Sequence, residues 1–362
     1  MKRVLLVGGG TAGHVEPALA VGRWLTEHDS EVEIEFLGTR HGIETDLVPK
    51  AGFALHCISK VPLPRKAGLS LLTFPARFLF SAIQSLAIIR NFDLVIGFGG
   101  YVSASAYFAA WIARKPIVIH EANALPGWSN RLGARFATEI AVAFPSVKQS
   151  YPAWSGAVES GMPIRREIWD LGEVALHNQQ SARTEQLLKL GLNPELPVIL
   201  VFGGSQGSTL MNKAIKEYAR TVEAGKVQFI HAVGGRNSLP LATKNYLPLS
   251  YIYNMAEMYL ACDLIISRSG AVTCAEIEAV HKFAILVPLP IGNGEQLSNA
   301  QDLVKSEAAI ICENSQFSVE WLKRNIPAAL TRAAEFNKSA KRRELRRADE
   351  VIGAIAISVM ER

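Results

Sequence analysis

Short apolar runs alternate with helix-length segments along the first half of the chain. The runs predict buried strands at residues 4–7, 32–37, 94–98, 117–120 and 139–142. Strands that are apolar throughout, with helical segments between them, are typical of a parallel sheet whose two faces are both covered by helices. The first half therefore predicts an α/β domain.

The same alternation restarts after a polar, helix-prone stretch at residues 173–193. Its apolar runs predict strands at residues 198–202, 227–231, 264–267 and 284–287. Both halves open with a strand that runs into a glycine-rich turn, as Rossmann-like domains do. We therefore expect two such α/β domains, with their parallel sheets facing each other across a ligand-binding cleft.

The composition fits a folded cytoplasmic protein. Of the 362 residues, 49% are hydrophobic and 20% are charged, which favours two globular domains over a disordered chain. The four cysteines contain no C-x-x-C pair, which argues against a zinc site or a disulfide framework. Because the first residues run directly into a strand, we expect no signal peptide.

The glycine-rich loop after the first strand, residues 8–14 (GGGTAGH), can bring backbone N–H groups close to an anionic ligand. It also matches the dinucleotide pattern G-x-G-x-x-G. That site needs an acidic residue at the tip of the second strand, however, and Glu35 lies inside the strand. His14 stands at the junction of loop and helix, and imidazole titrates near neutral pH, so His14 is the candidate general base.

Two further turns, residues 203–208 (GGSQGS) and 267–276 (SRSGAVTCAE), follow strands in the second half. Each could present a helix N-terminus and hydroxyl groups to a phosphate. Neither is a P-loop, because the Gly-Lys-Ser/Thr ending is missing. Glu276 would lie one to two turns into its helix, where its carboxylate could accept hydrogen bonds from ribose hydroxyls.

Polar residues also end the strand at 117–120, where His120 is followed by Glu121 and Asn123. This is the edge of a doubly wound sheet at which ligands bind. The sequence contains no H-E-x-x-H motif and no D-x-D pair, so we expect neither a metal nor another cofactor. Helix N-termini, hydroxyl groups and Arg165 would then stabilise the charge of a leaving diphosphate.

Residues 47–92 contain no acidic residue, although they include six lysines and arginines. A surface that mixes apolar side chains with cations suits anionic lipid headgroups, at about 1 kcal/mol per well-placed cation. A packed helix with solvated charges is the alternative, but it does not explain the missing acids. The candidate membrane patch comprises Lys60, Arg65, Lys66, Leu69, Leu71, Leu72, Phe74 and Arg77.

Six motifs, found in family order, carry a resemblance that spans nearly the whole chain. They are residues 9–17 (GGTAGHVEP), 99–103 (GGYVS), 120–123 (HEAN), 203–207 (GGSQG), 268–276 (RSGAVTCAE) and 295–300 (EQLSNA). With these motifs the chain resembles the MurG family, whose members transfer N-acetylglucosamine from a UDP-sugar to undecaprenyl-diphospho-muramoyl-pentapeptide.

The resemblance implies a GT-B fold. Residues 1–165 and a C-terminal helix at about 338–362 would form the domain that binds the acceptor and the membrane, residues 195–335 the UDP-sugar domain, and residues 166–194 a linker. The family also implies which residues contact substrate. On the sugar side they are Thr11, Ala12, Gly13 and Asn123, and around UDP they are Arg165, Ser205, Ile252, Ala271, Val272, Thr273, Cys274, Ala275, Glu276 and Gln296.

The resemblance further implies an inverting transfer to the C4 hydroxyl of the muramoyl sugar, the step from lipid I to lipid II in peptidoglycan synthesis. His14 would be the general base, with Glu121 as the substitute candidate. The implied location is the cytoplasmic face of the cell membrane, as a peripheral protein on its anionic inner surface. A cell-wall synthesis complex is an implied partner, and nucleic acid is not.

Two alternatives stay open. The chain could be a GT-B transferase with another nucleotide-sugar donor, or a nucleotide-binding protein that docks on membranes without catalysis. Four positions depart from the family pattern: Ala12 replaces a glycine, Glu16 an apolar residue, Met162 an asparagine and Glu295 a glutamine. We expect these departures to affect contacts with substrate rather than the reaction.

Overall fold

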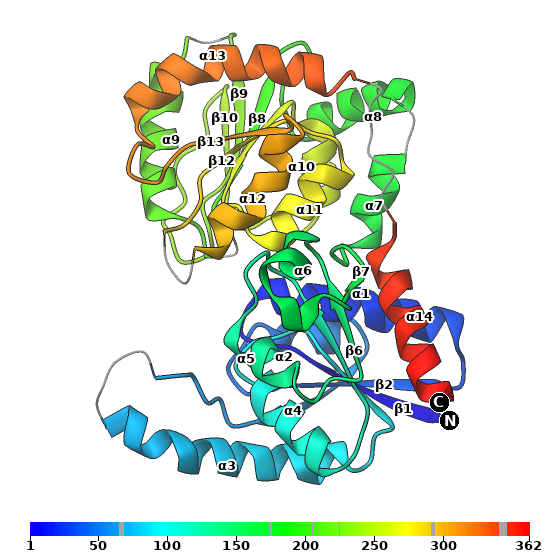
Figure 1. Cartoon of the computed structure of the whole chain (residues 1–362). Coiled ribbons are helices and arrows are strands. Elements are labelled where there is room, and N and C mark those ends of the chain that lie inside the picture. The colour runs from blue at the N-terminus through cyan, green and yellow to red at the C-terminus, as the bar shows by residue number, and fades with distance from the viewer. Residues whose placement is uncertain (65–68, 174–175, 205, 224, 291–293, 340–345) are drawn as a thin grey trace. The chain divides into compact units, whose positions relative to one another are not determined.

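The computed structural model describes residues 1–64, 69–173, 176–204, 206–223, 225–290, 294–339 and 346–362. The chain divides into two compact units. Met1–Arg165 with Arg346–Arg362 form the first, and Arg166–Leu345 form the second. Each unit contains one parallel sheet with helices packed on it (Figure 1). The prediction of two parallel α/β domains is thus confirmed.

The first unit is built on a seven-stranded sheet in the order β3-β2-β1-β4-β5-β6-β7. The strands are β1 (Lys2–Val7), β2 (Val32–Thr39), β3 (Ala54–Ile58), β4 (Leu94–Gly97), β5 (Ile117–Glu121), β6 (Glu139–Val142) and β7 (Val158–Glu159). The helices are α1 (Ala12–His28), α2 (Glu44–Lys50), α3 (Leu69–Ile89), α4 (Ser103–Ile112), α5 (Trp128–Gly133), α6 (Ser146–Ser150), the short 3₁₀ helix η1 (Pro152–Trp154) and α14 (Ala348–Glu361). The strand order reverses between β1 and β4, so the loops after these two strands flank the position where ligands bind in such sheets.

Alternate side chains of β1 supply the cores on the two faces of this sheet. Val4 and Leu6 pack with residues of α1 and α14, including Ile352. Leu5 and Val7 pack on the opposite face with residues of α3, α4 and the neighbouring strands. All four side chains are fully buried, which explains why β1 is apolar without alternation. The C-terminal helix α14 therefore completes the core of the first unit.

The second unit is built on a six-stranded sheet in the order β10-β9-β8-β11-β12-β13. Its strands are β8 (Val198–Phe202), β9 (Gln228–Ala232), β10 (Tyr246–Leu249), β11 (Leu264–Ser267), β12 (Ala284–Leu286) and β13 (Ala309–Ile311). Its helices are α7 (Arg166–Glu173), α8 (Leu176–Lys189), α9 (Thr209–Thr221), α10 (Met255–Ala261), α11 (Ala271–Ala279), α12 (Glu295–Lys305) and α13 (Val319–Phe336). Here the order reverses between β8 and β11.

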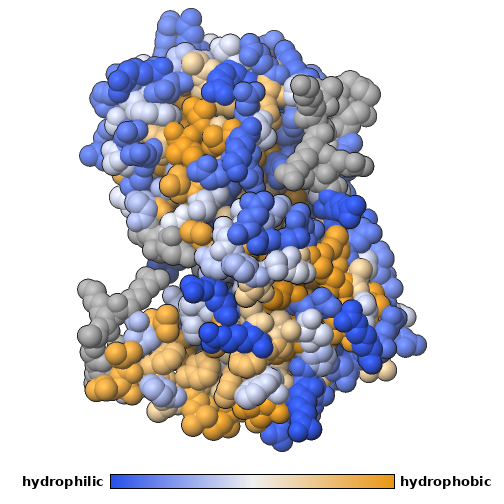
Figure 2. Space-filling view, in the orientation of Figure 1, coloured by the Kyte–Doolittle hydropathy of each residue, from blue (hydrophilic) through white to orange (hydrophobic). Residues whose placement is uncertain are grey.

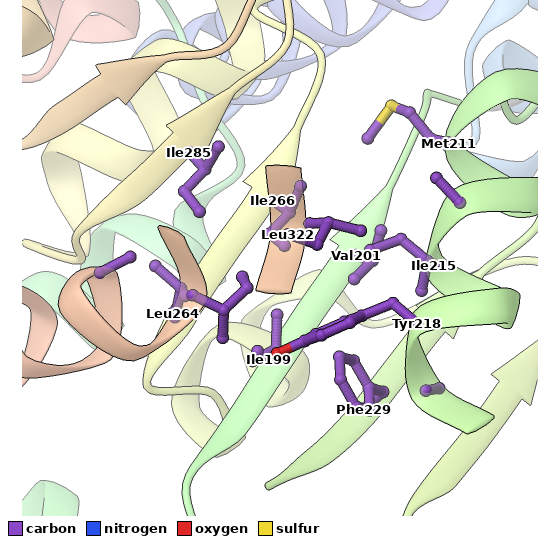
Figure 3. Packing of buried hydrophobic residues seen from close by; sticks show 14 of the residues in the cluster. Ile199, Val201, Met211, Ile215, Tyr218, Phe229, Leu264, Ile266, Ile285 and Leu322 are labelled. Carbon is purple, nitrogen blue, oxygen red and sulfur yellow. The ribbon is translucent and has the colours of Figure 1, made fainter. Parts of the chain in front are cut away.

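Helices α9 and α13 cover one face of the second sheet. Ile199 and Val201 of β8 lie against Met211 and Ile215 of α9, and Leu322 of α13 closes the same cluster (Figure 3). These side chains are fully buried. The cluster fixes the strands whose carboxyl ends carry the candidate phosphate-binding turns.

Residues 166–194, which we expected to be a linker, instead belong to the second unit as α7 and α8. Leu187 of α8 is fully buried, and Arg183 is 8% exposed. The Arg183 guanidinium donates to the Pro194 and Leu196 carbonyls and pairs with the Asp263 carboxylate at 2.6 Å. A polar helix is therefore held in place by one buried cation and a few apolar side chains.

Candidate functional site

The loop between β1 and α1 places His14 at the carboxyl edge of the first sheet. Strand β1 ends at Val7, and α1 begins at Ala12. Thr11 is the N-cap residue of α1, but its hydroxyl lies 3.0 Å from Nδ1 of His14 instead of capping the helix. The His14 ring is thus oriented from within its own loop.

The loop after β4 packs directly against this first loop. Gly99 and Gly100 have φ angles of +92° and +89°, in the left-handed region that favours glycine. A Cβ atom on Gly99 would lie 3.2 Å from Cδ2 of His14, and one on Gly100 would lie 2.6 Å from the Gly9 carbonyl oxygen. The two glycines therefore let the loops meet at the switch point of the sheet, beside the His14 ring.

His14 is half-buried in this arrangement. Burial lowers its pKa, against a hydrogen bond to the Gly9 backbone and the negative charge of Glu44, which both raise the pKa. The ring is consequently neutral near pH 7. A neutral imidazole is the form that accepts a proton from a hydroxyl group.

Glu121 ends β5 and is 2% exposed. Its Oε1 accepts from the backbone and side-chain nitrogens of Asn123 at 2.9 and 3.3 Å. Its Oε2 accepts from the Gly127 N–H at 3.1 Å and from Nδ2 of Asn130 at 2.9 Å. Burial raises the pKa of Glu121, and these hydrogen bonds oppose the rise. Because both oxygens are engaged, the geometry favours a role in positioning Asn123 over the role of a base.

Four loops at the carboxyl edge of the second sheet converge on Arg268, which follows β11 and is 8% exposed. Its Nη1 donates to the Val287 carbonyl at 2.9 Å, after β12, and to Oδ1 of Asn314 at 2.7 Å, after β13. Its Nη2 donates to Oγ of Ser208 at 2.8 Å, at the end of the loop after β8. The buried guanidinium of Arg268, which belongs to the turn after β11, thus connects this turn to the turn after β8.

We expect Arg268→Met to lower the free energy of unfolding by about 2 to 3 kcal/mol. The substitution leaves the Val287 carbonyl and the Asn314 side chain without their charged donor, and hydrogen bonds to charged groups contribute about 1.5 to 3 kcal/mol. Urea denaturation measures the loss. Arg220→Met, at an exposed position of α9, is the matched control and should change stability by less than about 0.5 kcal/mol. If the two variants had equal urea midpoints, the hydrogen bonds of Arg268 would not stabilise the protein as expected.

The first turns of α11 contain most of the expected UDP residues of the second unit. Ala271 and Cys274 are buried, whereas Val272, Thr273 and Ala275 are half-buried. Burial raises the pKa of the Cys274 thiol, which stays protonated. The start of α11 therefore offers mainly backbone N–H groups and the Thr273 hydroxyl to a ligand.

Gln296 lies in the first turn of α12, beside the start of α11. Its Oε1 accepts from the Leu289 N–H at 3.0 Å, and its carbonyl accepts from the Ser269 hydroxyl at 2.8 Å. Gln296 thus ties the turn after β11 to the segment after β12.

Glu276 is 3% exposed, and its Oε2 accepts a hydrogen bond from the Tyr259 hydroxyl at 2.9 Å. Ile252, which follows β10, is also buried. Ser205 lies outside the described residues. Arg165 ends the first of the two segments that form the first unit. The expected contacts of these residues with UDP remain predictions.

Helix α3 presents an exposed apolar surface on the first unit (Figure 2). Of the candidate membrane patch, Lys60, Leu71, Leu72 and Arg77 are exposed, and Phe74 is half-buried. Arg65, Lys66 and the side chain of Leu69 lie outside the described residues. The exposed apolar surface extends beyond the expected patch: it also includes Leu79, Phe80 and Ile83 of α3 and Trp111 and Ile112 of α4.

The basic residues of the patch adjoin the loop after β4. Nζ of Lys60 lies 5.1 Å from the centre of the Tyr101 ring, and Arg77 donates to the Lys60 carbonyl at 3.4 Å. Among the described helices, α3 alone meets the length and composition of a membrane span, over Leu71–Ile89, and 22% of that segment is buried. Among the described residues there is also no group of three or more His, Cys, Asp or Glu side chains that could hold a metal ion.

Known families match most of the chain, and a solved structure matches nearly all of it. The glycosyltransferase family 28 N-terminal domain matches residues 4–142, and its C-terminal domain matches residues 198–352. In solved structures, the chain is similar to MurG of Acinetobacter baumannii, with a TM-score of 0.75 and 25% identity over 99% of this chain and 100% of that one.

Relatives of established name agree with this match. A UDP-N-acetylglucosamine–N-acetylmuramyl-(pentapeptide) pyrophosphoryl-undecaprenol N-acetylglucosamine transferase of Streptomyces coelicolor is 41% identical over 96% of each chain. The enzyme of the same name from Corynebacterium diphtheriae is 44% identical over 88% of this chain and 85% of its own. The chain therefore belongs to glycosyltransferase family 28 and, within it, to the family of these N-acetylglucosamine transferases.

Proposed function

We propose that this chain transfers N-acetylglucosamine from UDP-N-acetylglucosamine to the muramoyl sugar of undecaprenyl-diphospho-N-acetylmuramoyl-pentapeptide. The observation that carries the proposal is the 41% identity, over 96% of each chain, to a relative named for this transfer. The reaction belongs to peptidoglycan synthesis. A transferase with another nucleotide sugar has no such support.

His14 is the proposed general base. The C4 hydroxyl of the muramoyl sugar gives its proton to the His14 ring while its oxygen attacks the anomeric carbon of N-acetylglucosamine. The bond from that carbon to the UDP oxygen breaks, and UDP leaves with the electron pair. Attack opposite the leaving group inverts the anomeric carbon and forms a β-1,4 linkage. The neutral state of His14 near pH 7 supports this role.

The first turn of α11 is the proposed site for the leaving diphosphate. Its backbone N–H groups and the Thr273 hydroxyl can donate to phosphate oxygens, as helix N-termini commonly do. Ser205 and Arg165 would add further donors, and Glu276 would hold the ribose. Thr11, Ala12, Gly13 and Asn123 would contact the sugars from the first unit.

The exposed surface of α3 and α4 is the proposed membrane contact, at the cytoplasmic face where the lipid-linked acceptor would be presented. The apolar side chains would enter the interface, and Lys60 and Arg77 would pair with anionic headgroups. Docking a cell-wall synthesis complex is a further proposal that rests on family membership alone.

A transfer assay tests the function. Purified protein is incubated with radiolabelled UDP-N-acetylglucosamine and the lipid-linked acceptor, and label is counted in the lipid fraction. We expect label in that fraction and none with an acceptor that lacks the C4 hydroxyl. Labelled UDP-glucose and UDP-galactose run in parallel. Faster transfer from either would favour another donor, and donor binding without transfer would favour a protein that lacks catalysis.

A further inference from the structure

A buried carboxylate lies beneath the loop that carries His14, and the proposed mechanism does not use it. Glu44 is the first residue of α2 and is 0% exposed. Glutamate is almost never fully buried unless its charge is compensated. The groups around Glu44 must therefore compensate its charge.

The Glu44 carboxylate accepts three hydrogen bonds, from the loop that follows β1 and from the last residue of β2. Its Oε2 accepts from the Gly10 N–H at 2.9 Å, within the glycine-rich loop. Its Oε1 accepts from the Thr39 N–H at 2.9 Å and from the Thr39 hydroxyl at 2.7 Å, at the end of β2. Each of these partners is an uncharged donor.

Three glycines make room for this carboxylate. A Cβ atom on Gly9 would lie 2.6 Å from Oε1 of Glu44, and one on Gly38 would lie 2.6 Å from its Cγ. A Cβ atom on Gly42 would lie 1.9 Å from Oε2. None of these glycines has a positive φ angle, so their small size, rather than their conformation, is what the site requires. The loop after β1 and the stretch from the end of β2 to α2 thus close around one side chain.

The site requires the ionised form of Glu44. Both oxygens face donors, and a protonated carboxyl group or an amide would turn one of its own hydrogens toward them. Burial alone would raise the pKa of Glu44, but hydrogen bonds from Gly10, from its own backbone and from Thr39 together hold the pKa below its ordinary value. A permanent negative charge therefore lies under the glycine-rich loop.

We propose that Glu44 is a positioning residue for His14: its carboxylate fixes the glycine-rich loop through Gly10 and sets a negative charge near the imidazole ring. The inference rests on the proposed function in taking His14 as the base. It also explains why an acidic residue after β2 does not make a dinucleotide site. The carboxylate that a ribose would need is occupied by the backbone of the loop itself.

Glu44→Gln tests the proposal. The amide removes the charge and turns an NH₂ group toward a donor, so the loop loses its fixed position. We expect kcat to fall by about tenfold, the effect of one lost charge-assisted hydrogen bond. Because the lost negative charge no longer favours imidazolium, the pKa of His14 falls, and the acid limb of kcat/KM moves to lower pH. KM for UDP-N-acetylglucosamine should change by less than about threefold, because Glu44 belongs to the first unit, whereas most of the proposed UDP residues belong to the second.

Two further variants separate charge, geometry and general destabilisation. Glu44→Asp keeps the negative charge, but its side chain is shorter by one methylene group. We therefore expect a lower kcat, while the acid limb of the kcat/KM profile stays near that of the wild type. Glu35→Gln is the matched control. Glu35 is another nearly buried carboxylate of the same unit, but it pairs with Arg3 and His56, away from the glycine-rich loop. This control should leave the acid limb unchanged.

A direct titration separates this inference from the proposed function. The His14 ring is followed by NMR across pH in wild-type, Glu44→Gln and Glu35→Gln proteins, with the signal assigned by its loss in His14→Gln. A lower His14 pKa in Glu44→Gln alone supports the coupling, even if His14→Ala retained activity and the base were another residue. The proposal would be overturned if the pKa of His14 were the same in all three proteins and the acid limbs of their kcat/KM profiles coincided.

Discussion

Replacing His14 with alanine should lower kcat about 100- to 10,000-fold, which is the typical effect of removing a general base. The acceptor hydroxyl would then have to lose its proton to water while it attacks. The ring lies beside Gly99, at the switch point between β1 and β4, and burial keeps it neutral at working pH. The measurement is the rate of label transfer to the lipid fraction at saturating donor and acceptor.

His28→Ala is the control for this substitution. His28 lies at the other end of α1, is exposed and stacks on Trp24 at 4.2 Å between ring centres, so its loss should change kcat by less than about twofold. Calorimetric binding of UDP should be the same in both variants, because the proposed UDP residues of the second unit are untouched. If His14→Ala retained kcat within about threefold, His14 would not be the base, and Glu121→Gln would be measured next.

The strands at the centre of both sheets could be predicted because they are buried on both faces. The run at 198–202 coincides with β8, and the run at 4–7 lies within β1. The missed strands β3, β7, β10 and β13 have partly exposed or polar residues, and all four lie at sheet edges. Their pairing depends on a neighbouring strand that is already in place, which no local pattern reports.

The approach of His14 to Gly99, with Glu121 at the same edge of the sheet, could be anticipated, because the carboxyl ends of β1, β4 and β5 share one edge of a parallel sheet. The contacts of Glu44 with the glycine-rich loop, and of Tyr259 with Glu276, could not be anticipated from the sequence. The burial of Glu44 depends on close approach by Gly9, Gly38 and Gly42. A glutamate at the start of a short helix looks solvated in sequence. Glu35 was the acid weighed for this region, and it instead pairs with Arg3 and His56.

The second large effect is expected on membrane binding, when Leu72, Leu79 and Ile83 of α3 are all replaced by glutamate. Spacings of seven and four residues place these side chains on one stripe of the helix, and they are 78%, 56% and 57% exposed. Each lost insertion costs about 1 kcal/mol, since full burial of such a side chain contributes about 1.5 to 3 kcal/mol. Each new negative charge costs about as much beside anionic lipid. We expect affinity for vesicles rich in phosphatidylglycerol to fall by at least about 100-fold, measured by cosedimentation.

The matched control carries the same three charges on the second unit, at the exposed residues Leu188, Leu239 and Leu241. It should sediment with vesicles as the wild type does. Both variants should transfer label equally well to an acceptor with a short, water-soluble lipid chain, because neither set of three residues belongs to the proposed site. Lys60 and Arg77 add an electrostatic part, so wild-type binding should weaken as salt rises. Equal vesicle binding by the two triple variants would place the membrane contact elsewhere on the chain, whereas selective loss in the α3 variant would assign it to this helix.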